Sequence, residues 1–236
     1  MFTERGPTVR ELVGQALSSV ERGYDLLAPK FDETPFRTPE VVLSATADAL
    51  AARGAYATGL DLCCGTGAGL GVLRQVCRER VVGVDRSAGM LAVAAASAGA
   101  ASLVRADALA LPFRGAFDLA VSFGAFGHFL PHQRPALFAE VHAALRPGGL
   151  LAFPITAPPR VGSAGYWVLW GFDAAMRVRN ALWRPPFVMY YRTFRLPDVR
   201  AELTEAGFTV ETPALSGLGH RPDGSPRCRL VLAHRR

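Results

Sequence analysis

Half of the 236 residues are hydrophobic and 19% are charged, a composition that excludes an intrinsically disordered or fibrous protein. The length predicts one domain with an elaboration, or two small lobes. The net charge of +6 is uneven: residues 1–157 hold fourteen charges of each sign, whereas residues 158–236 hold twelve basic and six acidic side chains. A basic last third is compatible with a nucleic-acid or anionic-membrane partner. However, all but one of the basic residues are arginine, and G+C-rich codon usage alone produces that skew.

The cysteines and the apolar runs bear on the compartment. The four cysteines form no Cys-x-x-Cys pair and are too sparse for a disulfide framework. The first residues lack the apolar run of a signal peptide, and no stretch reaches the ~18–20 uninterrupted apolar residues that span a bilayer. We therefore expect a soluble, cytoplasmic protein that is not stably inserted in a membrane.

The first 155 residues show two patterns of apolar residues. Apolar residues at helical spacing predict a helix from Val9 to Glu21 with Gly23 as its stop, and a second helix over residues 39–52. From Tyr56 onward, short apolar runs alternate with helical stretches. Strands are predicted at residues 58–62, 81–84, 102–105, 117–122 and 150–155, with helices at 68–77, 87–98 and 131–145. This alternation predicts a parallel sheet covered by helices on both faces.

The last 80 residues depart from this alternation. Residues 156–195 are rich in proline, arginine and aromatic side chains, and a helix is predicted at 196–206, opened by Pro197 and closed by Gly207. Two final strands, 208–211 and 228–233, lie too close in sequence for a crossover helix and are expected to pair antiparallel. The predicted fold is therefore α/β, a doubly wound and mostly parallel seven-stranded sheet with a C-terminal antiparallel hairpin and an aromatic-rich cap.

A glycine-rich turn is the sharpest motif in the chain. Residues 60–69 read Leu-Asp-Leu-Cys-Cys-Gly-Thr-Gly-Ala-Gly, an apolar strand that enters a turn at the edge of the sheet where such folds bind nucleotides. Asp61 lies four residues before Gly65, and Asp85 ends the next strand, where a carboxylate can accept both hydroxyl hydrogens of a ribose. Leu70 stands where an NAD-binding fingerprint needs glycine, and no Gly-Lys-Ser/Thr follows, which excludes a P-loop.

These residues resemble the class I S-adenosylmethionine-dependent methyltransferases of the small-molecule type. Further matches follow in the expected order: Ala106-Asp107-Ala108 after the third strand, residues 117–122 as the fourth strand, and Leu-Arg-Pro-Gly-Gly at 145–149 as the turn before the fifth. The resemblance implies a Rossmann-like fold and S-adenosylmethionine as the cofactor. It also implies four regions: an N-terminal helical lid (1–55), the cofactor-binding core (56–155), an aromatic cap insertion (156–195), and the final helix with the antiparallel strand pair (196–236).

The resemblance assigns cofactor contacts along the sheet edge. Asp61 and the turn would hold the amino-acid end, Asp85 the ribose and Asp107 the adenine amino group, while the backbone after strand four would face the methionine moiety. The expected cofactor-binding residues are Asp61, Gly65, Gly67, Asp85, Arg86, Met90, Ala106, Asp107, Ala108, Ser122, Phe123, Tyr24 and Arg37. Cys63 departs from the family pattern, in which a small Gly or Ala is more common. We interpret Cys63 and Cys64 as packing residues rather than as a metal site or a nucleophile.

The N-terminal segment also matches the family. Residues 24–32 are similar to the Tyr-Asp…Ala…Tyr-Asp segment of many small-molecule methyltransferases, in which aromatic side chains close over the cofactor. Phe31 replaces the second tyrosine, so no hydroxyl contact is expected there. Arg37 is a candidate partner for the cofactor carboxylate, with a surface arginine as the alternative.

Methyl transfer from a sulfonium mainly requires alignment of the reacting groups, and a general base near the end of strand four would assist it. His128 is the best-placed candidate base and His132 the second, against the alternative of a structural, hydrogen-bonded histidine. His142, His220 and His234 are expected at the surface.

An aromatic segment is expected to select the methyl acceptor. Residues 166–194 hold nine of the 22 aromatic residues and all three tryptophans. Because the segment follows strand five, it should cover the ligand side of the sheet, which suggests an apolar or aromatic acceptor. A helix that packs its aromatic stripe as core or as a dimer interface is an equal alternative. The expected substrate-binding residues are Phe126, His128, Tyr166, Trp170, Tyr190 and Tyr191.

The leading hypothesis is methyl transfer by in-line displacement to O, N or C of a small, fairly apolar or aromatic metabolite, such as a secondary metabolite. One alternative is methylation of RNA or protein, since arginines interleaved with aromatics can bind phosphates and stack bases. The absence of an Asn-Pro-Pro-Tyr run or a Pro-Cys nucleophile disfavours nucleic acid. The others are a cofactor-binding protein without methylation activity and a membrane-interface protein that binds through residues 164–182. A homodimer is left open.

Overall fold

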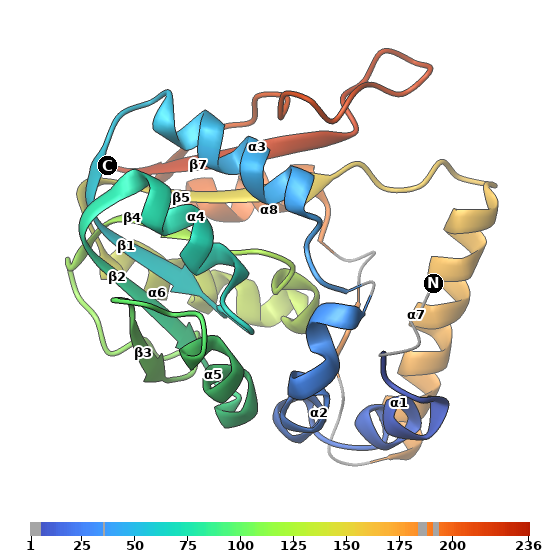
Figure 1. The fold of residues 1–236 in the computed structure, drawn as a ribbon. Coiled ribbons are helices and arrows are strands. Elements are labelled where there is room, and N and C mark those ends of the chain that lie inside the picture. The colour runs from blue at the N-terminus through green and yellow to red at the C-terminus, as the bar shows by residue number, and fades with distance from the viewer. Residues whose placement is uncertain (1–5, 35, 184–187, 191–193) are drawn as a thin grey trace.

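The computed structural model describes residues 6–34, 36–183, 188–190 and 194–236. Within these ranges the centre is a seven-stranded sheet (Figure 1). Its strands are β1 (Tyr56–Leu62), β2 (Cys77–Asp85), β3 (Ser102–Arg105), β4 (Phe117–Val121), β5 (Leu145–Thr156), β6 (Phe208–Glu211) and β7 (Cys228–Arg235). The order is β3-β2-β1-β4-β5-β7-β6. The first five are parallel, and β7 runs antiparallel to both β5 and β6. The predicted fold class is confirmed.

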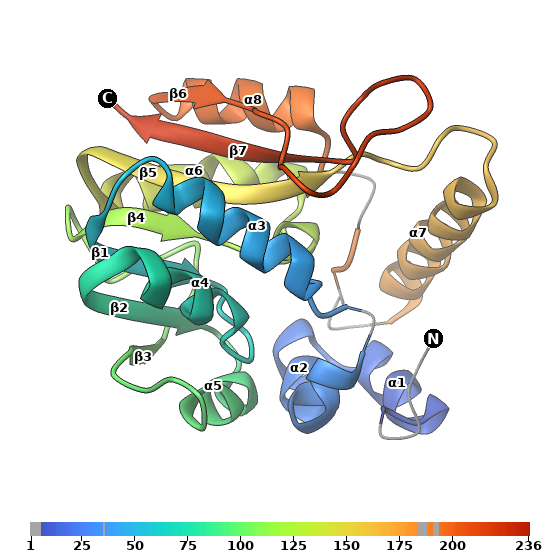
Figure 2. The same cartoon turned by 45° about the horizontal axis from the view of Figure 1, so that its top comes forward.

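Helices bury both faces of the sheet (Figure 2). On one face α3 (Glu40–Ala51) and α4 (Ala68–Val76) pack on the strands, and on the other α6 (Arg134–Ala144) and α8 (Leu196–Glu205) do so. Consecutive side chains of a strand point to opposite faces, so Leu119 and Val121 enter the first layer while Ala120 enters the second. The helix α5 (Ala88–Ala95) follows β2.

The N-terminal helix is divided in two, so the prediction of one helix over Val9 to Glu21 is wrong. The segment forms α1 (Val9–Ala16) and α2 (Val20–Leu27), followed by the 3-10 helix η1 (Ala28–Glu33). The break arises because Ser19 caps the second helix: its side chain accepts from the backbone N–H of Arg22, a donor that an N-terminus otherwise leaves unpaired. Gly23, the predicted stop, lies buried inside α2.

The turn predicted before strand five is part of β5. Leu145 pairs with Phe117 and Leu150 with Leu119, so five residues of β5 advance against two of β4. The surplus residues form a bulge, in which Gly148 adopts a φ of +77°. The helix predicted at 131–145 is likewise shorter, since η2 (Phe126–His128) and η3 (Pro131–Gln133) precede α6.

Elements of the predicted lid and cap lie in several parts of the molecule. Of residues 1–55, α3 belongs to the sheet layer, while α2 lies beside α5 below the sheet. Of residues 156–195, α7 (Ala164–Leu182) stands at the edge of the molecule near α1 (Figures 1 and 2). The Arg179 Nη2 donates to the Ser18 carbonyl at 2.9 Å, which ties α7 to the turn between α1 and α2. Among the described residues, no helix is both long and apolar enough to cross a bilayer.

Candidate functional site

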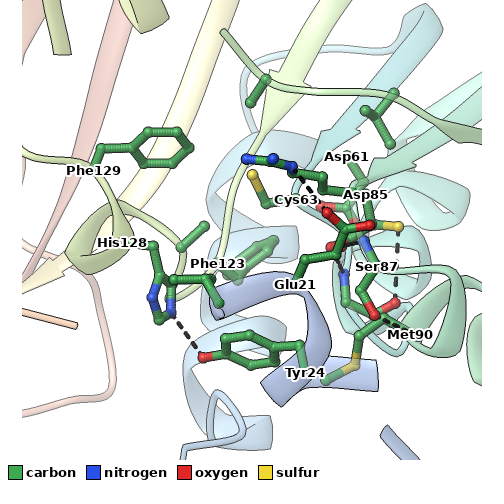
Figure 3. Close-up of a pocket in the computed structure, with 18 of the residues that line it drawn as sticks. Glu21, Tyr24, Asp61, Cys63, Asp85, Ser87, Met90, Phe123, His128 and Phe129 are labelled. Carbon is green, nitrogen blue, oxygen red and sulfur yellow. Dashed lines mark hydrogen bonds and ion pairs between the residues drawn. The ribbon is translucent and has the colours of Figure 1, made fainter. Parts of the chain in front are cut away.

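A cavity of about 480 Å³ opens at the carboxyl ends of the parallel strands. Residues that follow β1, β2, β3 and β4 border it from the sheet side, and α2 and η1 border it from the N-terminal side (Figure 3). The volume is typical of small-molecule sites, which commonly span roughly 300–1,000 Å³. Its position is the edge at which doubly wound sheets bind ligands.

The glycine-rich turn brings backbone and carboxylate into close contact. Cys63 has a φ of +56° and is the one non-glycine residue in the described ranges with a positive φ, and Gly65 and Gly67 follow at +51° and +97°. At Gly69, the first turn of α4, an added Cβ would lie 2.5 Å from a carboxylate oxygen of Asp61. Glycine at position 69 is therefore required for Asp61 to occupy its place.

Asp61 is a buried carboxylate with an unused oxygen. Its Oδ2 has no hydrogen-bond partner among the described residues, and the side chain borders the cavity. Burial, and secondarily the charge of Asp85, raises the pKa of Asp61 well above its usual range. A cationic donor in the cavity, such as an ammonium group, would satisfy this oxygen and favour its charged form.

Asp85 and Asp107 stand at the ends of the next two strands. The Asp85 Oδ2 accepts from the Gly65 N–H and its Oδ1 from the Ser87 N–H, both at 2.9 Å. Each oxygen keeps a further lone pair for a ligand hydroxyl, and burial raises the pKa of Asp85. The Asp107 Oδ1 accepts from the Leu109 N–H, while its Oδ2 lies 3.5 Å from Arg86 Nη1.

Eleven of the thirteen predicted cofactor residues border this cavity in the part of the chain that the structure describes. They are Tyr24, Arg37, Asp61, Gly65, Asp85, Arg86, Met90, Ala106, Asp107, Ala108 and Phe123. Ser122 and Gly67 do not border the described cavity. The Ser122 hydroxyl instead donates to the Leu62 carbonyl at 2.9 Å and joins β4 to β1. Gly67 lines a neighbouring cavity of about 310 Å³ together with Arg37, which lies 3.6 Å from both Asp32 and Glu40.

The chain is similar to several known proteins. Residues 60–149 match the family model described as a methyltransferase domain. The chain is 31% identical over 160 residues to an uncharacterized methyltransferase of Synechocystis sp.. The matched region covers 64% of this chain and 66% of that protein. A crystal structure of an S-adenosylmethionine-dependent methyltransferase from Mesorhizobium loti is 26% identical with a TM-score of 0.56, over 82% of this chain and all of that one.

The chain belongs to the class I S-adenosylmethionine-dependent methyltransferases. The family, the enzyme class and the cofactor predicted from the sequence are thereby confirmed. A second relative, a tRNA (carboxymethyluridine(34)-5-O)-methyltransferase of Saccharomyces cerevisiae, is 30% identical over 132 residues, or 55% of this chain. The chain spans 66% and 45% of the lengths of these two curated relatives.

The methyltransferase carries a tyrosine–histidine pair on the far side of the cavity from Asp61 (Figure 3). The Tyr24 hydroxyl and the His128 Nε2 lie 2.8 Å apart, and the His128 Nδ1 lies 2.7 Å from the Val188 carbonyl. A carbonyl only accepts, so Nδ1 carries the proton and Nε2 accepts from Tyr24. Burial lowers the pKa of His128, which keeps the ring neutral near pH 7.

The other predicted substrate residues lie elsewhere in the methyltransferase. Phe126 packs in the core, with its ring stacked on Phe194 at a centroid distance of 4.7 Å. Tyr190 is buried, and its hydroxyl accepts from the Asn180 side chain. Tyr166 and Trp170 lie on α7 and do not border the described cavity. Tyr191 lies outside the described residues.

Several site residues have no counterpart in the sequence prediction. Ser87 caps α5, and its side chain accepts from the Met90 N–H. A serine before a helical stretch is a typical cap signal, but the predicted site does not include Ser87. The Asp25 Oδ1 accepts from the Ser87 hydroxyl and from the Gly89 N–H, which joins α2 to the start of α5. Phe36 and Phe129 also border the cavity, and no local sequence pattern predicts this position for either residue.

The cysteines and remaining histidines act as packing and surface groups. Burial, together with the charges of Asp85, Asp61 and Asp107, raises the pKa of the Cys63 thiol well above its usual value, so it stays protonated. The described ranges contain no cluster of three potential metal-binding side chains. His142 is not a free surface residue as predicted but is half-buried against Phe208, with ring centroids 5.1 Å apart.

Proposed function

We propose that this methyltransferase modifies an oxygen, nitrogen or carbon atom of a small, apolar or aromatic molecule. The observation that carries the proposal is the character of the cavity beyond the three aspartates. There Phe31, Phe123 and Phe129 border it together with Tyr24 and His128. Burial of apolar surface is the main favourable contribution to binding in such a site, so aromatic walls favour an apolar acceptor.

The cofactor half of the cavity fits S-adenosylmethionine. The unused, buried Oδ2 of Asp61 suits the ammonium of the amino-acid end, and Asp85 retains lone pairs for the ribose hydroxyls. When bound, the cofactor supplies a methyl group on a positively charged sulfur, ready for in-line displacement. The chain then has to align the acceptor, and such alignment lowers a barrier by several kcal/mol.

The second contribution of the chain is removal of a proton from the acceptor. We infer that an acceptor hydroxyl passes its proton to the Tyr24 oxygen while Tyr24 passes its own proton to the His128 Nε2. His128 thereby becomes an imidazolium, and the Val188 carbonyl continues to accept from its Nδ1. His128 is the general base in this scheme, and Tyr24 connects it to the acceptor.

The test uses S-adenosylmethionine with an isotopically labelled methyl group, a panel of small phenols and amines, and transfer RNA as acceptors. Label is expected in a small molecule. The variants Tyr24→Phe and His128→Gln are expected to lower kcat about 100-fold or more while cofactor affinity changes little. Because burial lowers the pKa of His128 below 6.5, wild-type activity should persist at pH 6.5 and fall only in more acidic solution.

The matched control is His132→Gln, which changes an exposed histidine four residues away and should leave kcat unaltered. Label in transfer RNA but in no small molecule would overturn the proposed acceptor class. If His128→Gln keeps the wild-type kcat and acid limb, the base assignment is wrong even where the acceptor class is right.

A further inference from the structure

The helix α7 carries apolar side chains on its exposed side as well as on its buried side, whereas the exposed side of an ordinary surface helix is polar. Asp173 and Met176 are buried on its inner side, and Asn180 and Arg179 are partly buried there. The residues at alternating spacings of four and three along the other side are all exposed and uncharged: Ala164, Val168, Gly171, Ala175, Val178 and Leu182. A continuous apolar face of this kind on a described helix indicates an interaction surface.

All three tryptophans of the chain lie on or next to this face. Trp167 and Trp170 belong to α7 and Trp183 directly follows it, and their exposed fractions are 57%, 49% and 53%. Tryptophan combines a large apolar ring with an N–H that seeks a polar partner, so it is favoured at the boundary between lipid and water. We call this surface, from Ala164 to Trp183, the outward face of α7.

The segment that carries the outward face is basic in sequence, since residues 158–195 contain six arginines and a single acid, Asp173. In the described part of this segment Arg160 and Arg177 are exposed, whereas Asp173 is buried. A second copy of the chain would bring the same arginines to the interface without an exposed carboxylate from this segment to pair them. An anionic surface complements them instead, because basic side chains near anionic lipid are attracted to it.

We propose that the outward face of α7 docks on the surface of a bilayer that contains anionic phospholipid. The helix lies in the interfacial plane, with its tryptophans at the headgroup boundary and the exposed Arg160 toward the phosphates. This surface is separate from the cavity lining and independent of which acceptor is methylated.

The three tryptophans make the test specific, because their fluorescence reports on this face alone. Vesicles of phosphatidylcholine and phosphatidylglycerol are expected to shift the emission to shorter wavelength and to sediment the full chain, and added salt should release it. Vesicles of pure phosphatidylcholine should bind it more weakly. Val178→Asp should lower the partition coefficient roughly tenfold or more, because it replaces an apolar contact with a negative charge.

The matched control is Val41→Asp on α3. Val41 and Val178 have exposed fractions of 54% and 58%, so the chemical change and the exposure are alike and only the face differs. Leu182→Asp repeats the test at the helix end, should Val178→Asp fail to fold. The proposal is overturned if wild-type emission does not shift with anionic vesicles, or if Val178→Asp and Val41→Asp bind equally. It is also overturned if sedimentation velocity shows a dimer that Val178→Asp dissociates, or if RNA rather than vesicles shifts the emission.

Discussion

Asp61 and Gly69 form one unit at the scale of single residues. The missing Cβ of Gly69 provides the space for the carboxylate, and burial leaves that carboxylate with an unused oxygen at the cavity. A buried carboxylate with an unpaired oxygen is costly, so this arrangement sacrifices stability in the free protein for a cationic group that is bound later.

We expect Asp61→Asn to stabilise the cofactor-free protein by about 1 kcal/mol near neutral pH and to weaken S-adenosylmethionine binding roughly 10–100-fold. The folded-state pKa of Asp61 is raised, so the free protein loses stability as pH rises from the unfolded value near 3.8 through the folded value. The variant should lack this loss. Urea denaturation at mildly acidic and mildly alkaline pH, with calorimetry of cofactor binding, checks both effects. Equal cofactor affinity in variant and wild type would refute the role of Asp61.

At the scale of elements, the position of α2 over the cavity depends on its contact with the start of α5. Asp25 accepts two hydrogen bonds there, from the Ser87 hydroxyl and the Gly89 N–H, where a carboxylate also complements the helix dipole. An added Cβ on Gly89 would lie 2.9 Å from the Asp25 backbone, so the close approach requires glycine. Ser87 also donates its N–H to Asp85, which links this contact to the proposed ribose site.

We therefore expect Asp25→Ala to raise the KM for S-adenosylmethionine about tenfold and to lower the free energy of unfolding by about 1–2 kcal/mol. The kcat at saturating cofactor should change less, since Tyr24 and His128 remain. Steady-state kinetics and thermal denaturation measure the two effects. Asp48→Ala, which removes an exposed carboxylate from α3, is the control and should alter neither. A loss of stability without a change in KM would show that α2 does not shape the cofactor site.

The whole molecule is held together by contacts between distant segments, and the pair Arg134–Glu202 is one of them. The Arg134 Nη2 lies 2.8 Å from the Glu202 Oε1, which joins α6 to α8 with the arginine almost fully buried. Burial raises the pKa of Glu202 despite its partner. Removal of the arginine would leave a partly buried carboxylate without compensation.

Arg134→Ala should lower the free energy of unfolding by about 2–3 kcal/mol, less than for a fully buried pair because Glu202 keeps some exposure. The loss should grow as pH rises and Glu202 ionises. Arg195→Ala breaks the exposed pair Arg195–Asp198 and serves as the comparison, with an expected change below about 1 kcal/mol. Chemical denaturation of the two variants gives the difference, and equal losses would contradict the assignment of Arg134 to the core.

The inner side of α7 packs behind residues that border the cavity. Met176 of α7 packs with Met189 and Tyr190, and this cluster also contacts Tyr24 and Val188, which border the cavity. The inner side of α7 is thus part of the support of the acceptor site, while its outward face is exposed.

The ends of several helices and strands could not be predicted from the sequence, because the same local periodicity is compatible with more than one set of boundaries. The apolar spacing over residues 9–21 fits one helix or two, and the cap formed by Ser19 selects two. Leu145 to Gly149 reads as a turn, yet the partner strand converts it into a bulge of β5. His142 lies on a helix at a polar position but is half-buried because Phe208, 66 places later in the sequence, packs against it.

The sequence by itself determined the α/β fold and the sheet edge that binds ligands, because strand alternation and the spacing from the glycine turn to Asp85 are local patterns that do not depend on the packing. The cofactor followed from the resemblance of these motifs to a known family. Only the tertiary structure decided which groups face the acceptor. Tyr24 and His128 are 104 residues apart and meet through the packing of α2 against the loop after β4. The tertiary structure also leaves Trp167 and Trp170 of α7 exposed. Their spacing in the sequence does not determine this outcome, because the neighbouring elements decide which face of a helix is buried.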